Sequence, residues 1–109
     1  MKYHSKKTVI DGITFPSKAE AHRYVELKTL ENAGRISHLK LQPEFELIPS
    51  FKKNGKTFRK TVYRADFCYM QDGQFIVEDV KGFLTDVYKL KRKLFEWRYP
   101  DLTIKEVKR

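Results

Sequence analysis

The feature that most constrains the fold is a pair of strand-like runs in the second half of the chain. Thr61–Met70 and Gln74–Val80 are both rich in apolar and aromatic residues, and Gln71-Asp72-Gly73 joins them. Asp-Gly between two such runs is typical of a β-hairpin, because glycine accepts the positive φ that a tight turn requires. We therefore predict a central antiparallel hairpin.

Charged residues interrupt both of these strands. Asp66 lies within the first run, and Asp79 and Lys81 lie within or just after the second. Side chains two residues apart on a strand face the same side, so Asp79 and Lys81 share a face that Glu78 does not. Pairing across the turn places Asp66 near Asp79. Two carboxylates and an ammonium group at one sheet edge suit a divalent cation and a phosphate, since Mg²⁺ prefers hard oxygen ligands.

Composition favours a single domain over residues 1–109 with a polyanionic partner. The chain has 23 Lys and Arg against 14 Asp and Glu, a net charge of +9. Such a charge favours nucleic acid over a membrane surface, although basic small proteins also occur without such a partner. The one cysteine, Cys68, excludes an internal disulfide and a cysteine-based zinc site. Without a signal peptide or an apolar run of about 18 residues, we expect a cytoplasmic protein that does not enter membranes.

The first fifteen residues predict a basic arm followed by a small hairpin. Lys6 and Lys7 in the arm either contact the substrate or belong to an ordinary polar terminus. Thr8–Ile10 and Ile13–Phe15 flank an Asp-Gly turn, which indicates a short hairpin.

A helix is predicted from Ser17 to about Ala33, and Glu20 in its first turn has two interpretations. Ser-x-x-Glu is a capping box, in which the glutamate side chain returns to the cap residue. Glu20 also begins a row with Tyr24 and Leu27, which we expect to face the sheet. On that second interpretation Glu20 is a third carboxylate at the rim of the sheet.

Two further segments predict strands. Ile36–Ile48 alternates between apolar and polar residues, with Pro43 expected to mark a break, bulge or edge. Phe51–Phe58 predicts a hairpin around Asn-Gly. Its basic tip is either solvated or follows a phosphate backbone; the candidate DNA contacts there and in the next strand are Lys52, Lys53 and Arg64.

The last part of the chain predicts a helix from Thr85 to about Arg98 and a strand over Leu102–Val107. The apolar positions that we expect to form the core stripe of the helix are Val87, Leu90, Leu94 and Trp97. The basic residues expected on its other side, either solvated or bound to phosphate, are Lys89, Arg92 and Lys93. After the N-terminal hairpin the predicted order is αβββαβ, an α+β fold with a mixed sheet.

Asp66, then Asp79-Val80-Lys81 on the next strand, with Glu20 on a preceding helix, resembles the PD-(D/E)XK nuclease superfamily and its restriction-endonuclease-like core. The whole chain is also similar to small proteins carried by bacteriophages and prophages and described as a domain of unknown function. The segments that carry this second resemblance are KYHSKKTVIDGITFPSKAEAHRY, LQPEFEL, YRADF and VEDVKGFLTDVYKLKRKLF.

The resemblance implies a metal-dependent nuclease in a bacterial host. Asp66, Asp79, the Val80 carbonyl and Glu20 would bind Mg²⁺ or Mn²⁺, and Lys81 would orient or activate the attacking water. The expected reaction is DNA phosphodiester hydrolysis, structure-selective or weakly sequence-specific, since a chain this short has little surface for reading bases.

Three interpretations stay open on the sequence. The first is an endonuclease for Holliday junctions or other branched DNA in phage recombination or DNA processing, which predicts a homodimer because two symmetric cuts are needed. The second is a non-catalytic nucleic-acid-binding module. The third is a basic interaction protein whose acidic hairpin is merely paired with lysine and arginine.

Overall fold

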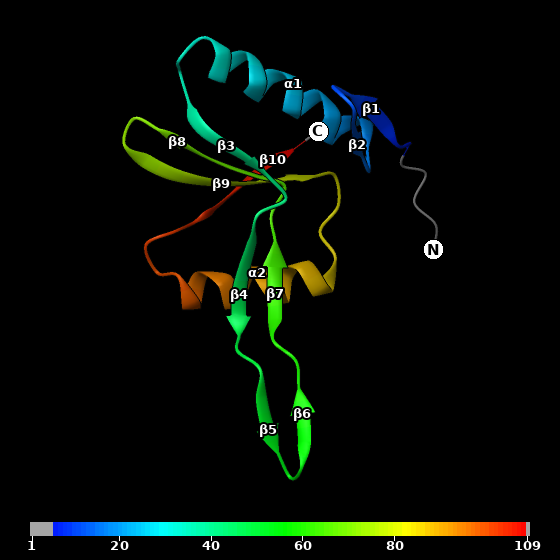
Figure 1. Cartoon of the computed structure of the whole chain (residues 1–109), viewed down its shortest axis with the longest axis vertical. Helices are drawn as coiled ribbons and strands as arrows, with labels where there is room; N and C mark the ends of the chain where they lie inside the picture. Colours follow the sequence, from blue (N-terminus) through cyan, green and yellow to red (C-terminus); the bar gives the residue numbers. More distant parts are fainter. Residues whose placement is uncertain (1–5, 109) are drawn as a thin grey trace.

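The computed structural model describes residues 6–108, so the first five residues of the predicted basic arm lie outside the described part of the chain. Two helices and ten strands follow in an α+β arrangement (Figure 1). In chain order they are β1 Thr8–Ile10, β2 Ile13–Phe15, α1 Lys18–Asn32, β3 Ser37–Leu41, β4 Glu44–Ile48, β5 Phe51–Lys53, β6 Lys56–Phe58, β7 Thr61–Arg64, β8 Phe67–Gln71, β9 Gln74–Lys81, α2 Asp86–Arg98 and β10 Ile104–Lys108.

A four-stranded mixed sheet with the order β10-β9-β8-β3 forms the centre of the molecule. β3, β8 and β9 are antiparallel neighbours, and β10 returns after α2 to lie parallel to β9. The β8–β9 turn is the two residues Asp72-Gly73, both with positive φ, at 51° and 77°. The predicted α+β class with a mixed sheet is therefore confirmed.

The helices cover opposite faces of this sheet (Figure 1). On the α1 face, Tyr24 and Leu27 pack with Phe67 and Tyr69 of β8 in one buried cluster. On the α2 face, Phe95 packs with other buried apolar residues in a second cluster. Strand parity determines which cluster each residue joins, as predicted for β9, whose Ile76 lies on the α1 side and whose Val77 lies on the α2 side.

Both helices begin at the predicted cap residues. Ser17 Oγ accepts a hydrogen bond from the Glu20 N–H at 3.1 Å, and Thr85 Oγ1 accepts one from the Tyr88 N–H at 3.0 Å. These bonds satisfy backbone donors that the first helical turn leaves free. Among residues 6–108, neither helix is long and apolar enough to cross a membrane.

Two long strands that the sequence predicts are each divided in the structure. The Ile36–Ile48 run becomes β3 and β4, separated at Gln42-Pro43, where Gln42 has a φ of 55°. The Thr61–Met70 run becomes β7 and β8, separated at Ala65-Asp66. The two breaks lie side by side, because the Gln42 N–H donates to the Asp66 carbonyl at 3.0 Å and the Ala65 N–H donates to the Pro43 carbonyl at 3.0 Å. Beyond them β4 and β7 leave the sheet as a separate two-stranded ribbon.

The predicted core stripe of α2 is wrong at three of its four positions, and only Leu94 packs against the second buried cluster. Val87, Leu90 and Trp97 are 64%, 57% and 76% exposed, whereas Tyr88 and Phe95 are buried. The aromatic face is preferred because it packs against aromatic residues of the β4–β7 ribbon: Phe95 lies 5.2 Å from Phe45 and 5.4 Å from Tyr63 between ring centroids. The rotation also moves Arg92 inward, to an ion pair with Glu106 at 2.6 Å.

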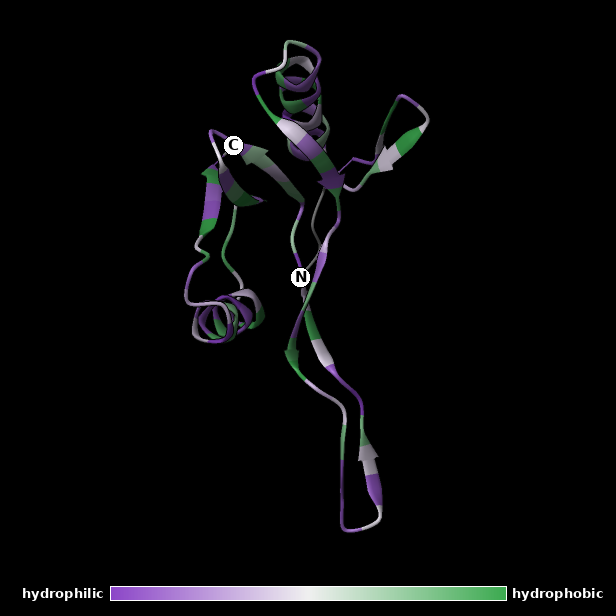
Figure 2. Ribbon diagram, turned by 60° about the vertical axis from the view of Figure 1, so that its left-hand side comes forward, coloured by the Kyte–Doolittle hydropathy of each residue, from purple (hydrophilic) through white to green (hydrophobic). Residues whose placement is uncertain are grey.

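The β5–β6 hairpin continues the β4–β7 ribbon away from the body of the molecule. Figures 1 and 2, drawn 60° apart, both show it beyond the two helices. Every residue from Phe51 to Phe58 is exposed. The hairpin predicted around Asn54-Gly55 is confirmed.

Candidate active site

The break between β7 and β8 holds Asp66 at the edge of β9. The Asp66 N–H donates to the Glu78 carbonyl at 3.1 Å, and its Oδ2 accepts a hydrogen bond from the Val80 N–H at 2.7 Å. The side chain therefore replaces the ladder bond that a continuous strand would make. This explains how a charged residue is accommodated in an otherwise apolar run.

Asp79 lies on the α2 face of the same strand and is 2% exposed. The Tyr63 hydroxyl donates a hydrogen bond to its Oδ2, and the Lys81 ammonium lies 3.1 Å from its Oδ1. The Lys81 Nζ is also 4.1 Å from the centre of the Tyr88 ring. Lys81 is thus held between a carboxylate and an aromatic face, as the shared strand face predicts.

Glu20 takes part in the helix cap and also reaches the acidic residues. Its backbone N–H makes the cap bond to Ser17, while its carboxylate, in a residue 5% exposed, accepts a hydrogen bond from Gln42 Nε2 at 2.7 Å. The same carboxylate is in hydrogen-bonding contact with Asp66. The carboxylate that a capping box would turn back to Ser17 binds Gln42 instead, so only the backbone of Glu20 takes part in the cap and its side chain follows the second interpretation.

Two of these carboxyl groups, Asp66 and Glu20, have a raised pKa. Burial raises the pKa of Asp66 to about 8, with further contributions from the nearby charges of Asp79 and Glu20. Burial, followed by the charge of Asp79, also raises the pKa of Glu20. Three acids this close together disfavour their own ionisation unless a cation compensates them.

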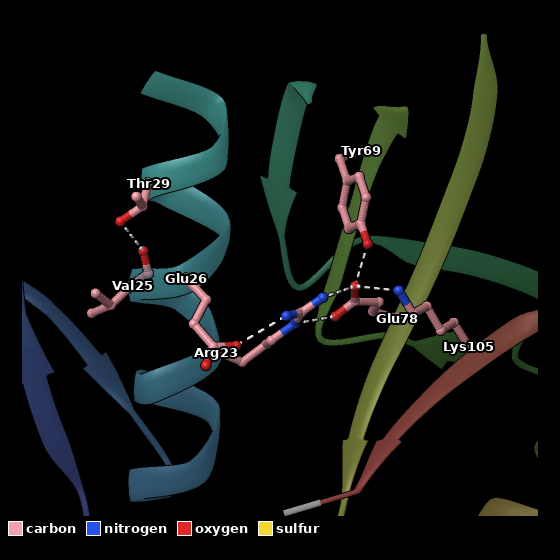
Figure 3. A network of polar contacts seen from close by, with 7 residues as sticks. All are labelled: Arg23, Val25, Glu26, Thr29, Tyr69, Glu78 and Lys105. Carbon is pink, nitrogen blue, oxygen red and sulfur yellow. Dashed lines mark hydrogen bonds and ion pairs between the residues drawn. The ribbon is translucent and has the colours of Figure 1, made fainter. Parts of the chain in front are cut away.

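Glu78 belongs to a different cluster, on the α1 face of the sheet (Figure 3). It is 0% exposed and accepts two hydrogen bonds from Arg23, at 2.9 Å from Nε and 2.7 Å from Nη2. Tyr69 also donates to it, and the Lys105 ammonium lies 3.8 Å away. This buried, paired carboxylate anchors α1 to β9, which keeps Glu20 in place at the start of that helix.

The donor set around Asp66 matches a hard divalent cation in its chemistry. Mg²⁺ is usually held by one or two carboxylates, with water and substrate phosphate completing its coordination. The Asp66 carboxyl accepts the Val80 N–H beside Asp79, and the charge of Asp79 helps to raise its pKa. As they stand, no three Asp, Glu, His or Cys side chains among residues 6–108 are arranged to hold a metal ion. The Asp66–Asp79 pair is thus the part of the predicted ligand set that the geometry supports best.

Two residues that the sequence did not single out complete the cluster. Tyr63 binds Asp79 from β7, and Gln42 binds Glu20 from the β3–β4 break. Aromatic residues and amides are common on strands, so neither residue type indicates this placement. The one available signal was Pro43, which marks the break where Gln42 turns toward the site.

The predicted DNA-binding residues lie on three separate surfaces. Lys6 and Lys7 precede β1, Lys52 and Lys53 lie on the projecting β5 strand, and Lys89 and Lys93 are exposed on α2. The two arginines are engaged within the protein: Arg64 pairs with Glu44 at 2.6 Å and Arg92 pairs with Glu106. A cavity of about 460 Å³ lies beside the acidic cluster, where its lining includes Lys81, Glu106 and Lys108.

No curated protein matches the chain. A family model described as "Protein of unknown function (DUF1064)" matches residues 1–109. The chain therefore belongs to the DUF1064 family.

Proposed function

We propose that this protein is a metal-dependent DNA endonuclease of the PD-(D/E)XK superfamily. The observation that carries the proposal is the strand break that holds the Asp66 carboxyl on the Val80 N–H, next to Asp79 in β9, with the Lys81 ammonium 3.1 Å from Asp79 on the same strand. Glu20 on α1 contacts the same pair. Two acids and a lysine arranged around one strand edge provide what phosphodiester hydrolysis requires: anchors for a cation and a positive group near the scissile phosphate.

Asp66, Asp79, the Val80 carbonyl and Glu20 would hold Mg²⁺ or Mn²⁺. When bound, such a cation lowers the pKa of water and neutralises phosphate charge. The Lys81 ammonium orients the attacking water and offsets the charge that develops on the phosphate. Tyr63 and Gln42 fix the orientation of Asp79 and Glu20 through their hydrogen bonds.

The raised pKa of Asp66 supports this proposal. In the absence of a cation, crowded carboxyls destabilise the folded state near neutral pH. Either one of them stays protonated, or it ionises and its negative charge is repelled by the neighbouring carboxylates. A protein can hold such a cluster without net cost if a divalent cation compensates it. Clusters of this kind are more frequent at functional sites than elsewhere.

Cleavage of supercoiled plasmid and of a synthetic four-way junction tests the proposal. Wild type should cut in Mg²⁺ or Mn²⁺ but not in EDTA, and Asp79→Asn should not cut, although Asn keeps an acceptor for Tyr63. Asp101→Asn removes an exposed carboxylate outside the cluster and should cut like wild type. If wild type cuts neither substrate, or if Asp79→Asn cuts as well as wild type, the proposal is wrong.

We further propose that the substrate is branched or weakly specific DNA in phage recombination or DNA processing. Junction resolution requires two symmetric cuts and therefore a homodimer. Sedimentation of the protein with and without a junction measures that assembly.

A non-catalytic DNA-binding module is the second candidate. It is favoured by one observation, which is that Asp79 already has a hydroxyl and an ammonium as partners. A binding module predicts that wild type and Asp79→Asn bind DNA equally and that neither cleaves it.

A further inference from the structure

The β5–β6 hairpin carries a concentration of positive charge that nothing in the described chain neutralises. Between Phe51 and Lys60 there are five basic residues and no acidic one, within a chain whose net charge is +9. In residues 6–108, the ion pairs within 4.0 Å involve lysines and arginines of other segments, and none of these five. The basic residues of the hairpin itself are Lys52, Lys53 and Lys56, and Arg59 and Lys60 follow directly after it.

Two of these lysines face each other across the turn. Lys53 is paired with Lys56 in the hairpin register, directly beside Asn54-Gly55. Like charges at opposed positions destabilise a two-stranded ribbon. A bound polyanion removes this repulsion, so the arrangement favours an anionic ligand over an apolar or basic one.

The same face of the hairpin presents two aromatic rings. Phe51 and Phe58 are 46% and 39% exposed, and their rings stack at 4.8 Å with an angle of 11°. Side chains alternate along a strand, so the phenylalanines share their face with Lys53 and Lys56. Cations next to exposed rings form the combination that binds unpaired nucleic-acid bases, because phosphates pair with the lysines and bases stack on the rings.

We propose that the β5–β6 hairpin is a DNA-recognition arm that binds the branch point of branched DNA. Lys53 and Lys56 contact phosphates, and the Phe51–Phe58 pair stacks on base faces that the branch leaves unstacked. Inside a regular duplex every base pair is stacked on its neighbours, so the phenylalanines give a preference for branched DNA whereas the lysines do not.

The place of the arm relative to the acidic cluster defines how it would act. It lies at the far end of the β4–β7 ribbon from Asp66 (Figure 1). Gly55 and Asp66 are separated by at most roughly 36 Å of extended chain, which is about one turn of B-DNA. Taking the proposed nuclease function as given, the arm contacts DNA within about one turn of the cut.

Binding measured in EDTA tests the arm without requiring cleavage. Fluorescence anisotropy is recorded over a range of salt concentrations with a four-way junction and with a duplex of the same arm sequence. Lys53→Gln/Lys56→Gln should weaken binding to both DNAs by about tenfold or more at 0.1 M salt and reduce the salt slope by about 2. The matched control is Arg35→Gln/Lys40→Gln, which removes the same charge from exposed residues outside the hairpin and should change binding far less.

The phenylalanines are tested by Phe51→Leu/Phe58→Leu, which keeps an apolar pair across the strands but removes both rings. Its affinity for the junction should fall by about tenfold, and its affinity for duplex should stay unchanged. If Lys53→Gln/Lys56→Gln binds DNA as tightly as the Arg35→Gln/Lys40→Gln control, the hairpin is not a DNA-binding arm. The same conclusion follows if poly-glutamate competes for the protein as well as DNA does. Undiminished junction preference in Phe51→Leu/Phe58→Leu would overturn branch recognition.

These outcomes are separate from the nuclease test. A protein that binds DNA through the hairpin but never cleaves it refutes the proposed function and leaves the arm in place. A protein that cleaves DNA with unchanged affinity after both hairpin replacements refutes the arm alone.

Discussion

Replacing Asp66 with asparagine should stabilise the metal-free protein near neutral pH. Asp66 is a carboxyl with a raised pKa, and its side chain accepts the Val80 N–H and lies close to the charges of Asp79 and Glu20. Asparagine keeps an acceptor oxygen for Val80 and supplies an N–H donor toward the other carboxyls. It therefore imitates the protonated form of Asp66 at every pH.

The magnitude follows from the change in the Asp66 pKa. Burial and the neighbouring carboxylates raise it from 3.8 to about 8. Because the folded-state pKa is the higher one, the stability associated with protonated Asp66 is fully present below about pH 4 and is lost as the pH rises toward 8. One pKa unit corresponds to about 1.4 kcal/mol, which sets an upper bound of roughly 5–6 kcal/mol; we expect Asp66→Asn to gain about 2–5 kcal/mol on wild type across this range.

Urea unfolding in EDTA at pH 4, 5, 6, 7 and 8 measures the effect. The free energy of unfolding of wild type should fall below that of Asp66→Asn as the pH rises, and the two should converge at pH 4. Asp101→Asn, which neutralises an exposed carboxylate, should follow wild type throughout. Added Mg²⁺ should restore wild type at pH 8 and leave Asp66→Asn unchanged, since the variant lacks one of the proposed ligands.

The reasoning would be refuted by parallel curves. If wild type and Asp66→Asn differ by the same amount at pH 4 and pH 8, the Asp66 carboxyl does not titrate against its neighbours in this range. The acidic cluster would then lack the electrostatic cost that supports a metal site.

Three further predictions concern the buried face of α2, the ion pair between α1 and β9, and the hydrogen bond that orients Asp79. Phe95→Ala should lower the free energy of unfolding in urea by about 3–5 kcal/mol, because Phe95 is 0% exposed. Trp97→Ala should lower it by less than about 0.5 kcal/mol, and equal losses would contradict the orientation of α2. Glu78→Gln should lower the free energy of unfolding by about 3 kcal/mol or more, since it leaves the Arg23 guanidinium without its buried partner. Arg23→Leu/Glu78→Leu should recover much of that loss. A Glu78→Gln protein as stable as wild type would show that the pair does not anchor α1. Tyr63→Phe should slow cleavage about tenfold at nearly unchanged stability, because it removes the donor that orients Asp79; unchanged rates would exclude a positioning role.

Local rules predicted most of the secondary structure. Asp-Gly and Asn-Gly identified all three tight hairpins, and Ser17 and Thr85 identified the helix starts. These features depend on backbone preferences of a few adjacent residues, which are visible in a single sequence. Pro43 was predicted to mark a break, bulge or edge, and the break between β3 and β4 lies there. The division at Ala65-Asp66 was less accessible, because it depends on two distant segments bonding to each other.

The orientation of α2 shows where sequence periodicity is insufficient. Val87, Leu90, Leu94 and Trp97 form a regular apolar row, yet the buried face is the one with Tyr88 and Phe95. The choice is made by the aromatic partners on β4 and β7, which a helical pattern alone does not contain. Of that row, Leu94 is half-buried against the second cluster, and Val87, Leu90 and Trp97 are exposed.

For the candidate site, strand parity predicted that Asp79 and Lys81 share a face and that Glu78 points away, and the structure agrees. Parity depends only on position along β9. The contacts from Tyr63 and Gln42 depend on the tertiary arrangement of the two strand breaks, so the sequence offered no comparable signal for them.

The binding of Mn²⁺ followed by electron paramagnetic resonance tests most directly whether this cluster gathers around a cation. At pH 7.5, wild-type protein should reduce the signal of free Mn²⁺ in proportion to the protein added, and Asp101→Asn should reduce it equally. Asp66→Asn and Asp79→Asn should leave the free-ion signal unchanged. A free-ion signal that wild type leaves unchanged, or that Asp79→Asn reduces as strongly as wild type does, would contradict the account.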